Sequence, residues 1–364
     1  MSFTTGRELR LTLFGSSHGQ SVGGTLDGLP SGTKVDLESI ARWLDYRKPG
    51  SSAFTSQRKE IDTFQIVSGI SGGYTDGGPV TMIIENKDAI SRHYDRIKEV
   101  PRPGHSDISQ FYKYGDFRVT AGGGFFSGRM TAPIVGLSSI ALNILNMNGV
   151  TVTSYIDNLG GIKLPSGISP GPLDAYAYKS RVPDNNLDAK ATELLKSAMA
   201  SGESIGAAVA TRIDGIPPGV GEPFFSSVES VLSSLMFSIP GLKGIEFGAG
   251  FGFAGKKGSE VVDEFARVGG KIETRTNHNG GILGGITIGM PVLFRVVMKP
   301  TSSIRKELRS ISLVEGGEKK LRIEGRHDPC IAIRAVPVIQ TLTAYGILDL
   351  ILSAKEPEIN LKFR

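Results

Sequence analysis

Cysteine and tryptophan are almost absent from this sequence, each occurring once among 364 residues. Because Cys330 is the only cysteine, an intrachain disulfide is excluded. The N-terminus lacks the charged segment and apolar core that mark a signal peptide. Long apolar runs are missing as well. The longest, 336–352, favours a buried helix over a membrane span because it is interrupted by Gln340, Thr341, Thr343, Gly346 and Asp349. These features predict a cytoplasmic protein.

Charge of one sign is also scarce. The formal net charge is +5, from 41 lysines and arginines against 36 aspartates and glutamates. No run of basic residues would follow a phosphate backbone, so the sequence does not favour a nucleic-acid-binding protein. A small anionic substrate suits this charge if the arginines converge. Because no segment resembles a linker, we expect a single domain over residues 1–364.

Apolar periodicity predicts the secondary structure. Strands are expected at 9–13, 63–69, 79–84, 206–213, 243–248 and 292–298. Helices are expected at 35–44, 131–148, 184–199, 223–237, 259–268 and 336–352. In the first helix, Asp36 suits the N-cap position. Its inner stripe is predicted to be Leu37, Ile40 and Leu44.

Glycine is abundant, at 48 residues, and it clusters in loops that also carry reactive side chains. The first loop follows a strand in segment 14–30, where His18 lies between Gly15 and Gly19. Glycine lets a backbone turn sharply and approach a ligand, and histidine exchanges a proton near neutral pH. The segment is equally consistent with an ordinary strand end and an incidental histidine.

Two further positions have both a structural and a functional interpretation. Arg47 follows the first predicted helix, where it either complements the helix dipole or binds an anion. His105 lies in a loop with proline and glycine, at 102–107. Asp107 in the same loop either orients the imidazole or caps a turn.

The second glycine-rich loop, 122–131, opens the second predicted helix. Free backbone N–H groups and the helix dipole favour an anion at such a position. Ser127 adds a hydroxyl and Arg129 a guanidinium. The pattern predicts a phosphate cradle, although it matches neither a Walker loop nor a dinucleotide fingerprint.

The last third carries three more stretches of this kind. Segment 277–285 surrounds two aliphatic residues with four glycines, which lets a flat ring lie against bare backbone. Segment 299–304 places a lysine before three hydroxyl residues, which suits a phosphate. In segment 325–330, Arg326 and Asp328 form either a surface ion pair or an anion clamp with a proton acceptor.

In combination, these motifs resemble the chorismate synthase family along nearly the whole chain. The three strongest are 15–30, 124–131 and 325–330, and segments 102–105, 280–285 and 299–303 lie between them. The resemblance implies an α/β (α+β) fold, a β-α-β sandwich with helices between antiparallel sheets, and a homotetramer. It also implies a lyase that converts 5-enolpyruvylshikimate 3-phosphate to chorismate and phosphate with reduced FMN (FMNH2). The reaction is an anti 1,4-elimination without net redox change.

The resemblance further implies roles for individual residues. His18 corresponds to the histidine that gives a proton to reduced flavin, His105 to the one near the substrate phosphate, and Asp328 to the carboxylate that draws a proton from flavin N5. The implied substrate clamp is Arg47, Ser127, Arg129 and Arg326. The implied flavin contacts are Phe125, Phe126, Ser127, Gly284, Lys299, Pro300, Thr301, Ser302, Ser303 and Arg326. No metal site is implied.

The chain departs from the common family pattern at several positions. Phe125-Phe126 stand where many members have Arg-Ser, Met130 where they have Glu, Ala53 where they have Arg, and Ser16 where they have Glu. These departures motivate a rival hypothesis, a non-catalytic flavin- or phosphate-binding relative. The source of reduced FMN is also open: NADPH as flavin reductant, or a separate flavin reductase. We find no dinucleotide fingerprint, which favours the separate reductase.

Overall fold

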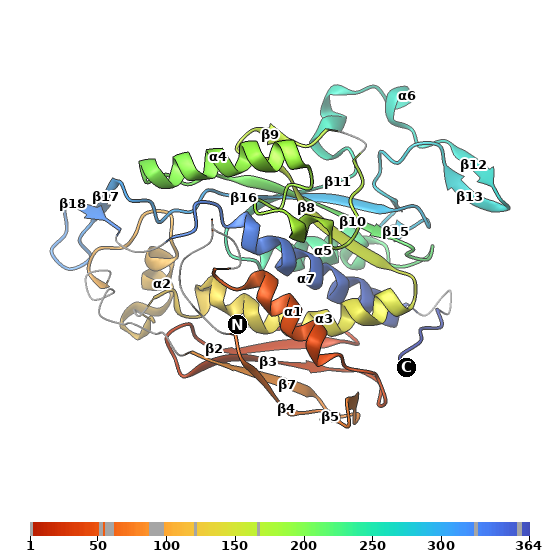
Figure 1. The fold of residues 1–364 in the computed structure, drawn as a ribbon, viewed down its shortest axis with the longest axis horizontal. Coiled ribbons are helices and arrows are strands. Elements are labelled where there is room, and N and C mark those ends of the chain that lie inside the picture. Colours follow the sequence, from red (N-terminus) through yellow and green to blue (C-terminus); the bar gives the residue numbers. More distant parts are fainter. Residues whose placement is uncertain are drawn as a thin grey trace.

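Two five-stranded antiparallel sheets enclose a layer of helices in the computed structural model (Figure 1). It describes residues 3–50, 54, 62–86, 98–119, 122–165, 168–323, 327–354 and 359–364. This arrangement confirms the predicted fold class, a β-α-β sandwich with helices between antiparallel sheets.

The N-terminal sheet uses alternating side chains to cover the helices. Its strands, in spatial order, are β1 (Thr4–Thr5), β2 (Arg10–Gly15), β3 (Ser21–Asp27), β7 (Val80–Glu85) and β4 (Phe64–Ser68). Leu9 and Leu11 are buried as the alternation predicts, and so are Val80, Met82 and Ile84. At Gly24 of β3, an added Cβ would press on Leu137 of the helix layer, so glycine permits this close approach.

The second sheet is built around the long strands β8 and β10. In spatial order it contains β11 (Leu242–Phe247), β16 (Val292–Met298), β10 (Ala207–Asp214), β8 (Thr151–Leu159) and β9 (Ile162–Lys163). Strand β8 has no counterpart among the predicted elements, although Val152 and Ile156 are buried in it. Helix α4 (Asn185–Ser201) lies outside the sandwich, above this sheet (Figure 1).

The enclosed layer holds α1 (Leu37–Arg47), α3 (Thr131–Met147), α5 (Val228–Phe237) and α7 (Ala332–Ser353). Segments Gly128–Met147 and Ala332–Ser353 are long and apolar enough to cross a membrane, but 83% and 94% of their most apolar windows are buried inside the protein. A helix that is apolar on all sides needs partners on all sides, and the two sheets supply them.

Helix α1 confirms its predicted cap, and it confirms Ile40 and Leu44 of its predicted stripe but not Leu37. The Asp36 side chain accepts a hydrogen bond from the Ser39 backbone N–H at 2.9 Å, as an N-cap does. Leu37, however, is 47% exposed. The buried stripe runs at the spacing of three and four residues through Ser39, Ile40, Trp43, Leu44 and Arg47.

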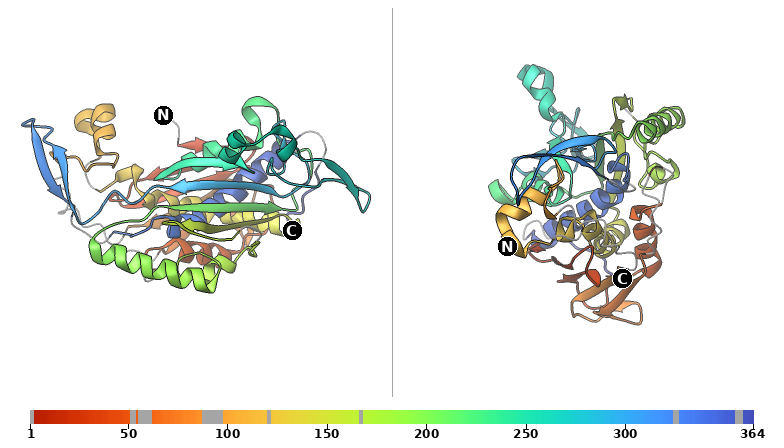
Figure 2. Two further views of the ribbon diagram at one scale, coloured as in Figure 1. Left: turned by 90° about the horizontal axis from the view of Figure 1, so that it is seen from above. Right: turned by 90° about the vertical axis from the view of Figure 1, so that its left-hand side faces the viewer.

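The helix predicted over 259–268 is wrong. Only α6 (Gly258–Val261) is helical, and the chain continues into the hairpin β12 (Phe265–Val268) and β13 (Lys271–Thr274). Gly269 and Gly270 both have positive φ, which suits a two-residue hairpin turn. The hairpin projects from one end of the molecule (Figure 2).

The opposite end brings distant segments of the chain together. Helix α2 (Asp107–Tyr114) and the hairpin of β17 (Glu307–Ile311) and β18 (Glu318–Arg322) lie there (Figure 2). Val100, Leu321 and Ile323 form a small hydrophobic cluster between them. The packing holds the loop of His105 beside the segment that follows β16.

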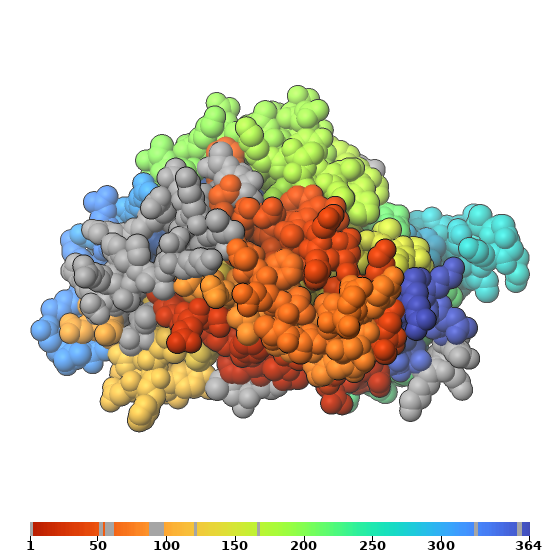
Figure 3. All heavy atoms as spheres, turned by 60° about the horizontal axis from the view of Figure 1, so that its bottom comes forward, coloured from red at the N-terminus to blue at the C-terminus, as the bar shows by residue number. Residues whose placement is uncertain are grey.

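The remaining elements are short, and the C-terminus is anchored. The hairpins are β5 (Ile70–Ser71) with β6 (Tyr74–Thr75), and β14 (Ile282–Leu283) with β15 (Ile286–Thr287). Residues 359–364 lie beside the N-terminal sheet, as Figure 3 shows. The Lys34 backbone N–H donates to the Phe363 carbonyl at 3.1 Å.

A carboxylate in α7 ties the N-terminal segment to the core. Asp349 accepts hydrogen bonds from the backbone N–H groups of Arg7, Glu8 and Leu9 at 2.8–3.1 Å. In Asp349→Ala the buried Leu9 donor and the half-buried Arg7 and Glu8 donors lose their acceptor, so we expect the free energy of unfolding to fall by about 2–4 kcal/mol. Urea unfolding measures this loss. A variant as stable as the wild type would mean that water replaces the carboxylate.

Candidate active site

One cavity of about 860 Å³ lies where the ends of the core helices meet the glycine-rich loops. Its lining includes Arg47 at the end of α1, Thr131 at the start of α3, and Arg334 in the first turn of α7. The size is in the range of small-molecule binding sites. Helix N-termini carry partial positive charge, so α3 and α7 both favour an anion here.

The first two glycine-rich loops pack against each other at this cavity. The Ser17 backbone N–H donates to the Gly124 carbonyl at 3.2 Å. A Cβ at Gly122, whose φ is +64°, would overlap the His18 imidazole. His18 lines the cavity, with Nδ1 3.0 Å from the Ser17 hydroxyl. Only glycine at 122 leaves room for this histidine.

The His105 loop is fixed to the lysine-hydroxyl segment that follows β16. His105 Nε2 lies 2.7 Å from the Ser303 hydroxyl. The Lys299 ammonium donates to the Gly104 carbonyl at 2.6 Å and to the Ser302 hydroxyl at 2.9 Å. Burial, followed by the charge of Arg102, lowers the pKa of His105 to about 4. The imidazole is therefore neutral at neutral pH.

Asp107 closes the turn instead of orienting His105 by a hydrogen bond. Its carboxylate accepts from the Arg102 backbone N–H at 2.9 Å and from the Arg102 guanidinium at 2.8 Å. Burial would raise the pKa of Asp107, but these bonds lower it below its ordinary value. Arg102 also lines the cavity.

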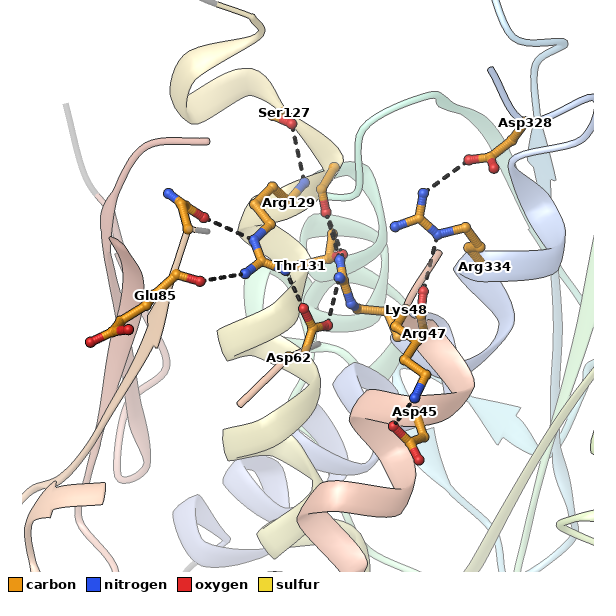
Figure 4. A network of polar contacts seen from close by, with 12 residues as sticks. Asp45, Arg47, Lys48, Asp62, Glu85, Ser127, Arg129, Thr131, Asp328 and Arg334 are labelled. Atoms are coloured by element: carbon orange, nitrogen blue, oxygen red, sulfur yellow. Dashed lines mark hydrogen bonds and ion pairs between the residues drawn. The ribbon is translucent and has the colours of Figure 1, made fainter. Parts of the chain in front are cut away.

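A buried carboxylate joins two of the predicted substrate-binding arginines (Figure 4). Asp62 accepts from Arg47 Nη2 at 2.8 Å and from Arg129 Nη1. Arg47 is almost fully buried, so it does not simply complement the α1 dipole at the surface. Its Nη1 donates to the Thr131 hydroxyl and the Gly128 carbonyl, each at 3.3 Å. Its Nε is buried without a hydrogen-bond partner among the described residues.

Asp328 lies at the cavity beside the first turn of α7. Its carboxylate pairs with Arg334 Nη1 at 3.0 Å, and Arg334 Nε donates to the Arg47 carbonyl at 3.0 Å (Figure 4). The Thr301 hydroxyl donates to the Asp328 carbonyl at 2.9 Å. Arg334 therefore links the predicted proton acceptor to the arginine network.

Aromatic rings form another part of the cavity wall. Phe125 and Phe126 line it, with ring centroids 4.7 Å apart. Phe125 makes edge-on contacts with Phe3 and Tyr114, at 5.6 and 5.7 Å. Rings in this arrangement stabilise one another, and they give the cavity a flat apolar surface.

The structure brings most of the predicted site residues to one cavity. Lining it are His18, Arg47, His105, Phe125, Phe126, Ser127, Arg129, Lys299, Thr301, Ser302, Ser303 and Asp328. Pro300 and Gly284 are not among the lining residues, and Gly284 lies in the turn between β14 and β15. Arg326 and Ala53 lie outside the described residues.

Several site residues escaped prediction. Lys243 and Arg334 line the cavity, and Asp62 lies behind Arg47 and Arg129. The sequence carried a local signal for Arg334 as a site residue. It is a cation in the first turn of a helix, six residues after Asp328. Asp62 had none, since it follows a polar stretch without periodicity.

Two lysines give the cavity free positive charge. Among the described residues, Lys243 and Lys299 have no carboxylate within ion-pair distance, whereas the lining arginines Arg47, Arg102, Arg129 and Arg334 each do. Burial and then the charge of Lys243 lower the pKa of Lys299. Cations that face each other without counter-ions favour an anionic ligand between them.

The sequence also contains a glycine pattern with dinucleotide spacing, at Gly250–Gly255. It matches the dinucleotide spacing G-x-G-x-x-G and follows strand β11. The segment forms a 3-10 helix next to an antiparallel sheet. The dinucleotide fingerprint requires an α-helix in a parallel βαβ unit, so this match does not indicate an NADPH site.

Comparison with known proteins identifies relatives of the whole chain. The sequence profile of chorismate synthase matches residues 9–352. Chorismate synthase of Korarchaeum cryptofilum is 39% identical over 346 residues, covering 94% of this chain and 96% of the relative. That of Thermococcus gammatolerans is 40% identical over 353 residues, covering 96% and 98%. A crystal structure of chorismate synthase shares the fold, with a TM-score of 0.76 at 24% identity over 98% of this chain and 95% of that one.

The lowered pKa of His105 gives a direct titration test. Between pH about 6.5 and about 4 the unfolded chain binds a proton that folded His105 does not, so this residue makes the protein less stable as pH falls. We expect NMR to show a neutral His105 imidazole down to pH about 4, and inorganic phosphate to raise this midpoint. His105→Gln assigns the resonance and removes its part of the stability slope. A midpoint near 6.5 without phosphate would contradict the burial argument.

Proposed function

The chain belongs to the chorismate synthase family, and from this premise we propose which of its groups carry out the family's reaction. That reaction eliminates phosphate from 5-enolpyruvylshikimate 3-phosphate to give chorismate, the last step of the shikimate pathway. The chain is accordingly a lyase of aromatic amino-acid biosynthesis. Enzymes of this family use reduced flavin.

We propose that FMN binds between the aromatic wall and the lysine-hydroxyl segment. Phe125 and Phe126 suit a flat ring, and Lys299 with the hydroxyls of Thr301, Ser302 and Ser303 suits a phosphate. The chemistry that reduced FMN supplies when bound is electron donation while the carbon–oxygen bond breaks, returned when hydrogen leaves. The absence of a carboxylate beside Lys299 among the described residues supports this placement.

The substrate carries a phosphate and carboxylates, which the arginine side of the cavity suits. We assign Arg47, Ser127 and Arg129 to substrate binding, because guanidinium groups match both kinds of anion. Arg326 keeps this assignment from the family resemblance alone, since it lies outside the described residues. Gly284 and Pro300 likewise remain flavin contacts only by resemblance.

We propose that His105 assists departure of the phosphate. Its Nε2 is held by Ser303, and no partner of Nδ1 is found in the described part of the chain, so Nδ1 is the nitrogen that can exchange a proton with a ligand. A phosphate dianion bound nearby favours the imidazolium form of His105. The residue therefore takes up a proton when the substrate binds. A group that gains its proton with the substrate can stabilise negative charge on the leaving oxygen.

His18 and Asp328 are proposed for the remaining proton transfers. His18 is oriented by Ser17 through Nδ1, which supports a role in supplying a proton to reduced flavin. Asp328 is oriented by Arg334, which supports a role in accepting a proton from flavin N5. Both line the same cavity, and this convergence of two histidines and a carboxylate is the observation on which the assignment rests.

The remaining proposals concern the setting of the enzyme. We propose a cytoplasmic homotetramer in which residues 1–364 form a single domain, supported by the one large hydrophobic core from Leu9 to Ile351. We also propose a separate flavin reductase as the source of reduced FMN. The rival hypothesis of a non-catalytic flavin-binding relative is favoured by Phe125 and Phe126, and the next experiment separates the two.

Turnover with photoreduced FMN under anaerobic conditions tests the catalytic assignment. The wild type should release phosphate and form chorismate, whereas flavin binding without turnover would support the rival. We expect His105→Ala to lower kcat by roughly 10²-fold or more, the usual cost of a lost acid–base group. His278→Ala is the matched control, because His278 lies outside the cavity lining. Equal rates for both variants would remove the role of His105.

The source of reducing equivalents has its own test. With NADPH and oxidised FMN under anaerobic conditions we expect no chorismate, because the segment with dinucleotide spacing, Gly250–Gly255, forms a 3-10 helix. Adding a flavin reductase to the same mixture should restore turnover. Chorismate formation with NADPH alone would show that the chain reduces its own flavin.

A further inference from the structure

A buried carboxylate next to the cavity, Asp62, has no assigned role. The side chains of Asp62 and Arg47 are each 1% exposed, and that of Arg129 is 8% exposed. Asp62 bonds both guanidiniums, one through each carboxylate oxygen (Figure 4). Burying three charged groups costs desolvation energy, and the attraction between the carboxylate and the guanidiniums offsets little more than this cost. Such a triad is therefore seldom explained by stability alone.

Asp62 reaches the cavity only through the arginines. Both Arg47 and Arg129 line the cavity, whereas Asp62 does not. The two arginines come from different elements, Arg47 from the end of α1 and Arg129 from the turn before α3. Asp62 is therefore a bridge behind two groups that are brought together from separate parts of the fold.

Among the described residues, the other partners of the two arginines do not replace this bridge. Arg129 donates to the Asn86 side chain at 3.1 Å and to the Glu85 carbonyl at 3.2 Å. Arg47 donates to Thr131 and to the Gly128 carbonyl. Each of these acceptors is neutral and holds one guanidinium, whereas Asp62 is the acceptor found to contact both.

Electrostatics explain why a charged bridge is needed. Burial lowers the pKa of Arg47, and the neighbouring charges of Arg334 and Arg129 lower it further, while Asp62 opposes this shift. Burial would raise the pKa of Asp62, yet the two arginines lower it below its ordinary value. Asp62 is thus ionised at neutral pH and holds together two cations that would otherwise repel.

We propose that Asp62 is the positioning residue of the anion site, which fixes the separation and direction of the Arg47 and Arg129 guanidiniums toward the substrate. The proposal rests on the assignment of these arginines to substrate binding made above. Its consequence concerns geometry: Asp62 makes the clamp rigid before the substrate arrives, so that less ordering is needed on binding.

Because Asp62 is negatively charged, its electrostatic effect and its positioning effect predict opposite changes in anion affinity. Asp62→Asn removes a negative charge behind the arginines, which by Coulomb attraction alone should strengthen anion binding. Loss of positioning should weaken it instead. We expect the Kd of 5-enolpyruvylshikimate 3-phosphate, measured by calorimetry on the protein loaded with oxidised FMN, to rise about 10-fold or more, since a 1 Å misplacement can cost 10²-fold.

Two further variants complete the experiment. Asp62→Glu keeps the charge and displaces the carboxylate, so its Kd should lie between those of the wild type and Asp62→Asn. Asp349→Asn is the matched control, a buried carboxylate outside the cavity that should lose stability and keep the wild-type Kd. In kinetics, KM should rise in Asp62→Asn with a smaller change in kcat.

The outcomes separate this inference from the proposed function. If the wild type neither binds nor converts the substrate, the proposed function fails. If the wild type is active and folded Asp62→Asn binds as tightly or more tightly, the positioning role is overturned. If Asp62→Asn does not fold, Asp62→Glu decides: binding about 3-fold or more weaker supports the role, and wild-type affinity overturns it.

Discussion

The rest of the structure depends on the packing of α3 and α7 between the two sheets. Both helices are apolar on nearly all sides, so neither can lie at a surface, and each needs cover above and below. The antiparallel sheets provide that cover with their alternating side chains. The starts of both helices then face one cavity. Loops from distant parts of the chain meet there the polar groups that the helix ends leave open.

The positive charge of the cavity is arranged in two ways. Its arginines are paired with carboxylates, because a buried guanidinium without a counter-ion is strongly unfavourable, and this pairing fixes their direction. Lys243 and Lys299 are paired with no carboxylate among the described residues, so their charge is available to a ligand. The arginines thus fix the geometry of the site, and the lysines supply positive electrostatic potential. This division suits a site for two phosphorylated molecules.

The fold also sets the chemistry of individual groups. His105 is a loop residue whose low pKa arises from burial against the segment that follows β16 and from nearby cations. A neutral imidazole can take up a proton when an anion binds beside it, which a histidine that is always charged cannot do. Phe125 and Phe126 belong to an aromatic cluster with Phe3 and Tyr114, so the departure from Arg-Ser is built into the wall of the cavity.

The sequence by itself determined most elements, because strand alternation, caps and glycine loops are local signals. It gave the sandwich class and most of the cavity residues through the resemblance of its motifs to the chorismate synthase family. Local periodicity failed at 259–268, where a hairpin turn at Gly269 and Gly270 outweighed a short helical pattern. Strand β8 is rich in β-branched residues that favour a strand, but it was not among the predicted elements. Only the tertiary structure decided that Arg47 and Arg129 share Asp62, that Arg334 holds Asp328, and that His105 is neutral. Ion pairing and desolvation depend on which distant groups become neighbours, and that is fixed only when the sheets close over the helices.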